Sequence, residues 1–340
     1  ANPQLAALIT SRIGDGWVSD LDQLQKLRKL AKDAGFRKEF AAVKRANKLR
    51  LAEVIKRELN IAVNPDSLFD IQIKRIHEYK RQLLNVLHIV TLYNRIRQGT
   101  HANIVPRTII IGGKAAPGYV MAKRIIRLIN NIAEIINHDP AVGDRLKVLF
   151  FPNYNVSNAE LIIPAADLSE QISTAGTEAS GTGNMKLSLN GALTIGTLDG
   201  ANIEIMEEVG ADNFFLFGLT TEEVTDLRNK GYHSWDYYHA NGELKQVLDM
   251  IGAGYFSPDE PDRFQPIVEA LLKYNDYYLL LADYASYVAC HDRVGALYSK
   301  PDEWIEKAIL NVAGMGKFSS DRTIRQYAEQ IWRVKRVPAR

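Results

Sequence analysis

The sequence has one cysteine, no long hydrophobic run and almost no net charge. Cys290 alone cannot form an internal disulfide or a cysteine-rich metal cluster, and it is typical of a reducing compartment such as the cytoplasm. The 42 Lys and Arg residues against 40 Asp and Glu leave a formal net charge of +2, so there is no basic field that would attract nucleic acid. The longest apolar stretches are far shorter than the roughly 20 residues of a membrane-spanning helix. We therefore expect a cytoplasmic protein that binds neither nucleic acid nor a membrane.

The composition that is present is that of a globular protein. The chain has 340 residues, 46% hydrophobic and 24% charged, which is enough for one large domain or two ordinary ones. It begins with Ala1-Asn2-Pro3, without an initiator Met or a secretory signal pattern. We expect a piece of a longer chain that is not exported.

The first sixty residues are expected to form a charged helical hairpin. Leucines recur every third residue from Leu21 to Leu30, and Ser19 with Asp22 has the spacing of a capping box. A second apolar stripe, from residue 36 to about residue 59, lies among many Lys and Arg residues and predicts a second helix.

Between residues 66 and 232, short β-rich runs alternate with longer helical ones. This alternation predicts an α/β fold with a doubly wound, mostly parallel sheet, helices on both faces, and ligands at the carboxyl ends of the strands. Residues 233–340 are expected to be mostly helical. The expected strands are 68–73, 108–111, 146–151, 167–172, 193–197 and 214–217, and the expected helices are 81–97, 119–136, 200–209 and one that starts at residue 221.

A glycine-rich segment from Thr174 to Lys186 carries the richest chemical signal. Its glycines, Gly176, Gly181 and Gly183, are costly to order, which indicates close approach of the backbone to a ligand. Where such a loop opens a helix, its amides form an anion site suited to phosphate, and Lys186 would face the same pocket. A tight turn with a surface lysine is the alternative.

This segment matches neither of two common nucleotide-binding motifs. Gly176 and Gly181 have the glycine spacing of a Walker P-loop, but Thr182 stands where that motif needs lysine. The dinucleotide fingerprint fails because no third glycine follows Gly181 and Gly183 at the required spacing. The loop 112–118, after an expected strand, also lacks this spacing and is a candidate ligand loop.

A second cluster, within residues 74–82, places four cations directly after an expected strand. Arginine and lysine at that position indicate recognition of phosphate, and a solvated basic start of a helix is the alternative. The four cations are Lys74, Arg75, Lys80 and Arg81.

The sequence shows little sign of a metal site or of a nucleophilic hydrolase. His77 lies beside Glu78, but no second histidine stands at ligand spacing, so no metal is expected. Cys290 has no evident activating partner, and no Gly-x-Ser-x-Gly motif is present. The other histidines are scattered and are expected to be structural or exposed; they are His88, His101, His138, His233, His239 and His291.

Four runs resemble the α-glucan phosphorylases, which act on glycogen, starch or maltodextrin. They are KRIHEYKRQ (74–82), GGKAAPG (112–118), IPAADLSEQISTAG (163–176) and EASGTGNMK (178–186). The resemblance covers nearly the whole chain and concerns the carboxyl-terminal half of an enzyme with two Rossmann-like lobes of the GT-B type. Residues 1–340 would then be the cofactor-bearing lobe, with a helical lead-in (1–65), a Rossmann-like core (66–232) and a helical tail (233–340).

The resemblance implies that the chain binds pyridoxal 5′-phosphate. Lys186 would hold the cofactor as a Schiff base, and Tyr154 would flank its ring. Thr182, Gly183 and Lys74 would bind its phosphate, which agrees with the anion site expected from the glycine-rich segment.

The resemblance also implies reversible transfer of the terminal glucosyl residue of an α-1,4-glucan to orthophosphate, which gives α-D-glucose 1-phosphate with retention. Glu178, Ser180 and Gly181 would bind hydroxyls of the glucosyl unit, and Arg75 and Lys80 would bind the substrate phosphate. The cofactor's phosphate would exchange a proton with the substrate phosphate, and the nearby cations would offset the repulsion between the two.

The resemblance also implies regulatory sites and subunit contacts, most of which would lie in the amino-terminal half of the enzyme and not in this chain. Tyr119 matches an aromatic of an inhibitor site, although Val120 stands where animal members commonly have His. Allosteric activation by nucleotides and most of the contact of the expected homodimer would belong to the missing amino-terminal lobe, without which we expect no activity. Two alternatives remain: a non-catalytic module that binds phosphosugars, and a nucleotide-sugar glycosyltransferase lobe in which no Schiff base forms.

Overall fold

The computed structural model describes residues 1–100, 104–335 and 337. At its centre is a six-stranded sheet in the order β3-β2-β1-β4-β5-β6, in which every pairing is parallel. This order is that of a doubly wound Rossmann-like sheet, so the predicted α/β fold class is confirmed. The strands are β1 (Leu68–Ile73), β2 (Arg107–Gly112), β3 (Leu146–Phe151), β4 (Leu168–Gln171), β5 (Leu193–Gly196) and β6 (Phe214–Leu216).

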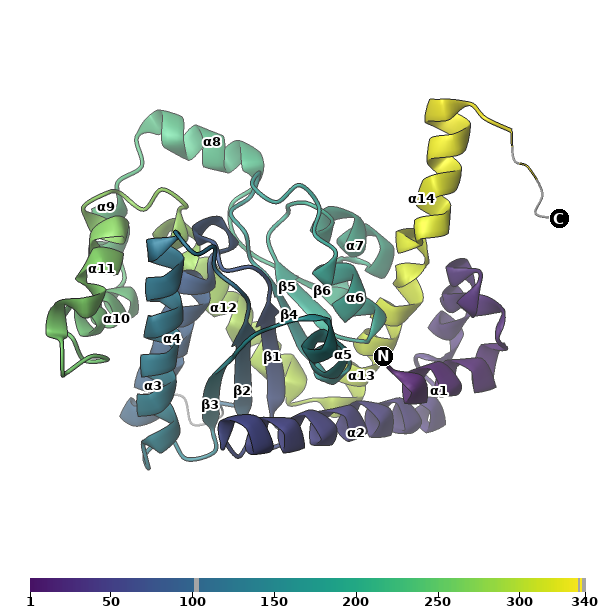
Figure 1. The fold of residues 1–340 in the computed structure, drawn as a ribbon, viewed down its shortest axis with the longest axis horizontal. Helices are drawn as coiled ribbons and strands as arrows, with labels where there is room; N and C mark the ends of the chain where they lie inside the picture. Colours follow the sequence, from purple (N-terminus) through teal and green to yellow (C-terminus); the bar gives the residue numbers. More distant parts are fainter. Residues whose placement is uncertain (101–103, 336, 338–340) are drawn as a thin grey trace.

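Helices cover both faces of the sheet and extend beyond its ends (Figure 1). One apolar core lies between the sheet and α3, α4 and α12, and a second lies between the sheet, α2 and α5. The helices are α1 (Pro3–Ile13), α2 (Ala34–Leu59), α3 (Gln82–Gln98), α4 (Val120–His138), α5 (Val156–Ala165), α6 (Gly183–Leu189), α7 (Asn202–Val209), α8 (Thr221–Lys230), α9 (Ser234–Ala240), α10 (Gly242–Gly252), α11 (Gln265–Leu272), α12 (Leu280–Tyr298), α13 (Pro301–Ala313) and α14 (Ser320–Gln326).

Side chains of the central strands point alternately into these two cores. In β1, Leu68 belongs to the core with α3 and α4, whereas Phe69 and Ile71 belong to the core with α2 and α5. In β2, Ile109 belongs to the core with α3 and α4, and Ile110 belongs to the core with α2 and α5. A strand that is buried on both faces is apolar along its whole length, which is why these strands could be located from short hydrophobic runs.

The lead-in is helical as predicted, but its first leucine-rich segment has a different geometry. Leu21–Leu30 forms a 3-10 helix, whose three residues per turn match the spacing of its leucines. The carboxylate of Asp20 caps this helix by accepting a hydrogen bond from the amide of Asp22 (3.3 Å). The predicted capping by Ser19 is therefore wrong.

The sequence prediction also omitted α5, the helix that connects β3 to β4. Its first turn is capped by the side chain of Asn155, which accepts a hydrogen bond from the amide of Asn158 (3.1 Å). Pro164 lies in its last turn, where a proline obscures the helical pattern of a short segment. Parallel strands need such a crossover, and α5 carries the chain from one edge of the sheet to its centre.

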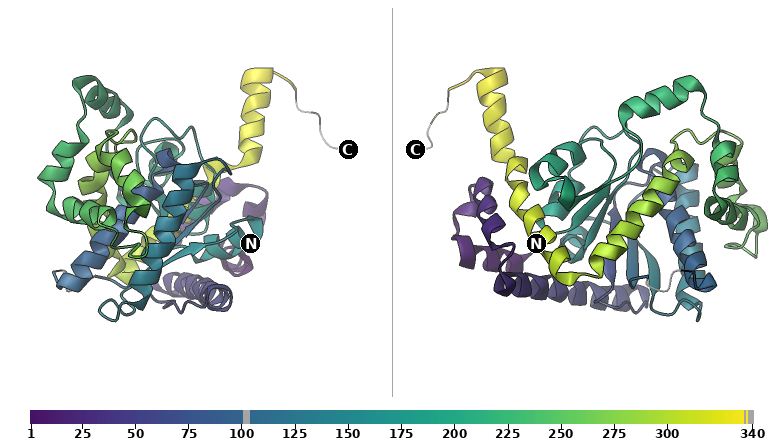
Figure 2. Two further views of the ribbon diagram at one scale, coloured as in Figure 1. Left: turned by 60° about the vertical axis from the view of Figure 1, so that its left-hand side comes forward. Right: turned by 180° about the vertical axis from the view of Figure 1, so that it is seen from behind.

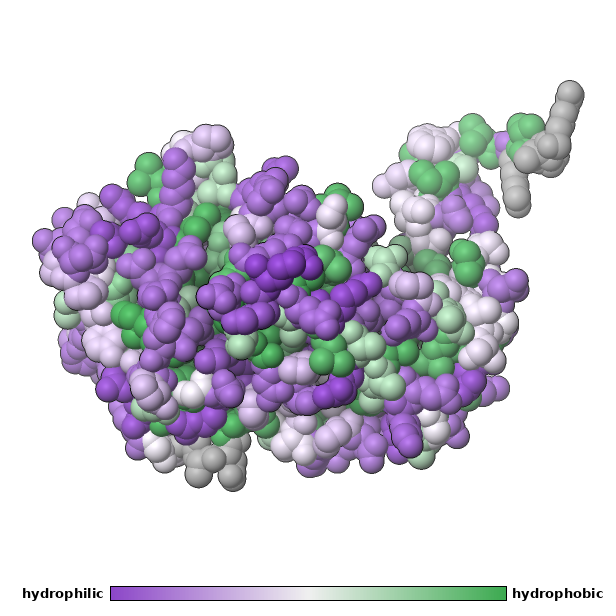
Figure 3. All heavy atoms as spheres, turned by 60° about the horizontal axis from the view of Figure 1, so that its bottom comes forward, coloured by the Kyte–Doolittle hydropathy of each residue, from purple (hydrophilic) through white to green (hydrophobic). Residues whose placement is uncertain are grey.

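The residues after 233 are mostly helical, as predicted. α12 and α13 pack against the body of the molecule, and α14 extends away from it (Figure 2). Figure 3 shows the molecule turned so that the side bearing α2 comes forward, and hydrophilic side chains are prominent there. Within the described part of the chain, no helix is long and apolar enough to cross a membrane.

A buried ion pair joins the turn after β1 to α12. Arg81 is fully buried and adopts a left-handed conformation (φ 54°). Its guanidinium donates to Oδ2 of Asp283 (2.7 Å) and to the carbonyl of Ile172 (2.7 Å), and Asp283 also accepts a hydrogen bond from the amide of Leu219 (2.9 Å). Arg81 was predicted to belong to a phosphate-binding group of cations, and it is instead committed to the fold.

We expect Arg81→Met to lower the free energy of unfolding by about 3–5 kcal/mol, because Asp283 would lose its cationic partner in the core. Arg75→Met, at an exposed position of the same segment, should change it by less than about 0.5 kcal/mol. Urea unfolding of both variants measures the two effects. Equal losses would show that the ion pair has no special role.

Candidate functional site

A cavity of about 500 Å³ lies at the carboxyl ends of β1 and β4. These strands are neighbours, but the chain continues from β1 toward β2 and from β4 toward β5, on opposite sides. Doubly wound sheets bind ligands at such a switch point. The predicted site residues that line the cavity are Lys74, Lys80, Tyr154, Glu178, Gly181, Thr182, Gly183 and Lys186.

Three predicted site residues lie outside this lining, as far as the described residues define it. Arg75 and Ser180 are exposed, each next in sequence to a lining residue. Tyr119 belongs to a separate cluster, in which its hydroxyl donates to Oε2 of Glu78 (2.6 Å) and its ring lies edge-on to His77, with the centroids 4.9 Å apart.

Lys74 joins the ends of the two central strands. Its ammonium donates to Oε1 of Gln171, the last residue of β4, at 2.7 Å. Burial lowers the pKa of Lys74 to about 8, and the nearby charge of Lys80 acts in the same direction, while Glu178 opposes them. A bound anion would stabilise the charged form. Gln171 was not predicted as a site residue, although it lies near the end of the expected strand 167–172.

Lys80 and Glu178 form an ion pair on the wall of the cavity. Burial disfavours the charge of Lys80, but hydrogen bonds to Glu178 and Tyr79 outweigh burial and raise its pKa. The Lys80 side chain is only 15% exposed, which is low for a lysine in a connecting segment between a strand and a helix. The pair places a cation and a carboxylate side by side, a combination that can bind both phosphate and hydroxyl groups.

The glycine-rich segment is held in place by two residues that the sequence analysis did not single out. Oδ2 of Asp199 accepts hydrogen bonds from the amides of Thr177 (3.2 Å) and Glu178 (2.8 Å). Gly200 has a φ of 51°, and a Cβ atom there would lie 2.6 Å from the carbonyl oxygen of Glu178. Asp-Gly is a common turn signal, and its position after an expected strand was the available clue.

The glycine-rich segment opens a helix, as expected, because α6 begins at Gly183. Lys186 lies on this helix, exposed to solvent and on the cavity wall. Tyr154, just before α5, lies on the same cavity, and burial raises the pKa of its phenol. The site thus combines a lysine amine, an aromatic ring and two further ammonium groups.

These residues fit a cofactor that carries an aldehyde and a phosphate. The amine of Lys186 is suited to bind an aldehyde, and Lys74 with the backbone of Thr182 and Gly183 is suited to a phosphate. Tyr154 offers a ring surface to an aromatic group. A volume of about 500 Å³ is in the range of cofactor sites.

The fold also brings together Asp70, Glu170 and His291, from β1, β4 and α12, with ligand atoms all within 4.8 Å of one another. This group was not visible in the sequence. A guanidinium nitrogen of Arg107 lies 2.7 Å from Nδ1 of His291, so that nitrogen is the acceptor and the imidazole proton is on Nε2, 3.1 Å from Glu170. Arg107 also donates to Oδ2 of Asp70 (3.1 Å), and Tyr287 donates to Oε2 of Glu170 (2.9 Å), while burial raises the pKa of Glu170 to about 7.

The remaining candidates have structural surroundings or are exposed. Burial raises the pKa of the Cys290 thiol to about 12, which leaves it unreactive at neutral pH. His88 is buried with its ring stacked on His291 at 3.9 Å, and His138 is exposed. His101 lies outside the described residues.

Comparisons with known proteins are consistent across nearly the whole chain. A family model described as carbohydrate phosphorylase matches residues 1–334. The chain is 58% identical over 337 residues to glycogen phosphorylase of Synechocystis, and 57% identical over 342 aligned residues to the muscle forms of glycogen phosphorylase of Homo sapiens and Oryctolagus cuniculus. Each match covers 99% of this chain but 40% of the relative, so the chain spans less than half the length of these relatives.

The pKa of Lys74 leads to a prediction about anion binding. We expect the affinity of the chain for inorganic phosphate to fall as the pH rises through about 8, because the ammonium loses its proton there. Lys74→Arg should remove this fall, since a guanidinium stays charged from about pH 7 to about pH 9.5. Isothermal titration calorimetry across this range measures the effect. The same fall in the variant would contradict the role given to Lys74.

Proposed function

Because this chain belongs to the carbohydrate phosphorylase family, we propose that it forms the cofactor-binding lobe of an α-1,4-glucan phosphorylase. The observation that carries this proposal is the cavity at the switch point. Its lining includes Lys74, Lys80 and Lys186 together with residues of the glycine-rich segment. The proposed reaction is reversible transfer of the terminal glucosyl residue of an α-1,4-glucan to orthophosphate. It would give α-D-glucose 1-phosphate with retention.

The proposed cofactor is pyridoxal 5′-phosphate. Lys186 would hold it covalently, Tyr154 would contact its ring, and Lys74 with the backbone of Thr182 and Gly183 would bind its phosphate. When bound, the cofactor supplies a phosphate group that can exchange a proton with the substrate phosphate. The partial burial of Lys74 strengthens its attraction for that phosphate, because fewer water molecules screen the charge.

The proposed substrate contacts lie next to the cofactor contacts. Lys80 would bind orthophosphate from the cavity wall, and exposed Arg75 would approach it from the rim. Glu178, Ser180 and Gly181 would bind hydroxyls of the glucosyl unit. Two phosphates that lie side by side repel each other, so the proposal requires several cations, and Lys74, Arg75 and Lys80 meet that requirement.

The relatives are longer than this chain, which supports a role for further protein in closing the site. We propose that a second lobe covers the glucan-binding side of the cavity and that the complete protein is a cytoplasmic, allosterically controlled homodimer of the GT-B type. Tyr119, with Glu78 and His77, is proposed as part of a separate inhibitor site.

Two other functions differ from the proposed one in what they require of Lys186. A module that only binds phosphosugars would use Lys74 and Lys80 but would not need the amine of Lys186. A nucleotide-sugar glycosyltransferase lobe would bind a diphosphate with the same cations and would form no covalent bond to a cofactor. The position of Lys186 on the cavity wall favours the phosphorylase.

We predict that Lys186 is the residue that binds the cofactor, because its amine lies on the cavity wall at the start of α6. Lys186→Ala should abolish the long-wavelength absorbance of the chain loaded with pyridoxal phosphate. Borohydride reduction followed by peptide mapping should place the adduct at Lys186, and Lys186→Arg serves as the charge-matched control, which should also remain unlabelled. An adduct at Lys74 or Lys114 would overturn the assignment.

We also predict that the 340-residue chain alone binds pyridoxal phosphate but shows no phosphorolysis. An open half of a cleft leaves the phosphates hydrated, which weakens each electrostatic contact and admits water. The test is release of glucose 1-phosphate from maltodextrin and phosphate, by the chain alone and after mixing with a separately prepared amino-terminal lobe of a glycogen phosphorylase. Robust activity of the chain alone would be incompatible with the prediction.

A further inference from the structure

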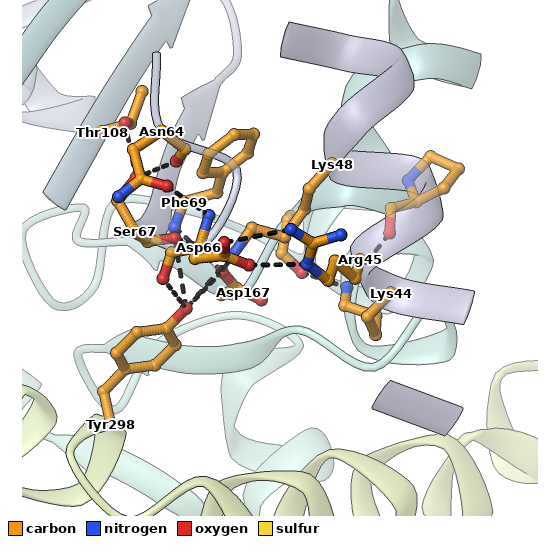
Figure 4. Close-up of polar contacts among 12 residues, drawn as sticks. Lys44, Arg45, Lys48, Asn64, Asp66, Ser67, Phe69, Thr108, Asp167 and Tyr298 are labelled. Atoms are coloured by element: carbon orange, nitrogen blue, oxygen red, sulfur yellow. Dashed lines mark hydrogen bonds and ion pairs between the residues drawn. The ribbon is translucent and has the colours of Figure 1, made fainter. Parts of the chain in front are cut away.

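Two buried lysines project from α2 into the body of the molecule, one turn apart (Figure 4). Lys44 and Lys48 are each 4% exposed, and the exposed Arg45 between them pairs with Asp66 at the surface. Neither lysine lines the cavity described above. Their partners differ, and the difference indicates different tasks.

Lys44 binds the ends of two helices at once. Its ammonium donates to the carbonyl oxygens of Pro164 (3.1 Å) and Ala166, at the end of α5, and to the carbonyl oxygen of Asn190 (3.2 Å), directly after α6. The carbonyl groups in the last turn of a helix lack partners within the helix and carry partial negative charge. A single cation therefore satisfies the carboxyl ends of both helices.

Both of these helices form the cavity. α5 contributes Ala159 and Ile163 to the lining, and α6 contributes Gly183 and Lys186. Asn190 continues the connection, because its amide and its side chain both donate to the carbonyl of Lys186, at 3.2 and 2.8 Å. Lys44 is thus linked by two successive sets of hydrogen bonds to the backbone of the proposed cofactor lysine.

Lys48 is tied to a different part of the fold. Its ammonium donates to the carbonyl of Ser67 (2.7 Å), to Oδ2 of Asp167 (2.6 Å) and to the hydroxyl of Tyr298 (3.1 Å). Ser67 and Asp167 directly precede β1 and β4, so this lysine holds the starts of two strands and the end of α12. Lys48 is therefore a matched control: a second buried ammonium on the same helix that has no bond to the ends of α5 or α6.

We propose that Lys44 is a positioning residue that sets α5 against α6 and so determines the width of the cofactor cavity. Without its ammonium, three carbonyl groups, two of them buried, would lose a shared donor, and the two helices would no longer be held at a common point. The cavity itself is an observation, whereas the identity of the ligand in it rests on the function proposed above. The test therefore has one arm that needs no ligand.

The first arm is hydrogen exchange of the chain without ligand, measured by mass spectrometry. Lys44→Met should accelerate amide exchange in peptides that cover residues 156–166 and 183–192. Lys48→Met should accelerate exchange around residues 64–69 and 294–301 instead. If Lys44→Met does not fold, Lys44→Gln, which keeps a neutral hydrogen-bond donor at this position, takes its place. Equal acceleration of both helices by the Lys44 and Lys48 variants would overturn the proposal.

The second arm is titration of both variants with pyridoxal phosphate, followed by absorbance. We expect Lys44→Met to weaken binding by about tenfold or more, whereas Lys48→Met should stay within about twofold of the unmodified chain even if it lowers the melting temperature further. If the loss of affinity in each variant were proportional to the fall in its melting temperature, Lys44 would be a structural residue and the proposal would be wrong. If the unmodified chain does not bind pyridoxal phosphate, the proposed function fails, and the exchange arm still decides the role of Lys44.

Discussion

The parallel pairing of β1 with β4 determines where this molecule can bind a ligand. Asp70 lies opposite Leu168 and Ile71 opposite Ser169, so the two strands end at nearly the same level. The chain then leaves the two strand ends toward opposite edges of the sheet, and the loops that follow cannot close the gap between them. The hydrogen bond from Lys74 to Gln171 spans the floor of that gap and places a cation at the point where both loops begin.

The left-handed conformation of Arg81 directs this side chain away from the three cations that precede it, Lys74, Arg75 and Lys80. Arg81 turns into the core and pairs with Asp283, while Lys80 pairs with Glu178 on the cavity wall and Arg75 stays in solvent. One short segment therefore anchors α12 and supplies the charge of the site. Each buried cation has its own acceptor, but repulsion between neighbours remains, because the charge of Lys80 helps to lower the pKa of Lys74.

The elements that could be predicted from the sequence are those in which one local pattern dominates. Strands buried on both faces and long amphipathic helices have such patterns, and the glycine-rich segment signals a ligand loop by its composition. α5 was missed because it is short and Pro164, in its last turn, obscures the helical pattern of the sequence. Other features depend on contacts between distant parts of the chain. These are the hydrogen bond of Gln171 to Lys74, the hydrogen bonds of Asp199 to the glycine-rich segment, the cluster around His291, and the different partners of Arg81 and Lys80. Composition and spacing contain no information about such contacts.

The geometry of the site also depends on the helices that precede the sheet in sequence. α2 runs across the side of the sheet where the strands begin, far along the chain from the glycine-rich segment, yet its lysines hydrogen-bond to residues next to β1, β4, α5 and α6 (Figures 1 and 4). A buried ammonium is tolerated only where acceptors surround it, so each lysine constrains every element that supplies one of its acceptors. A change in the packing of α2 therefore reaches both walls of the cavity through hydrogen bonds, although α2 contributes no residue to the cavity lining among the described residues.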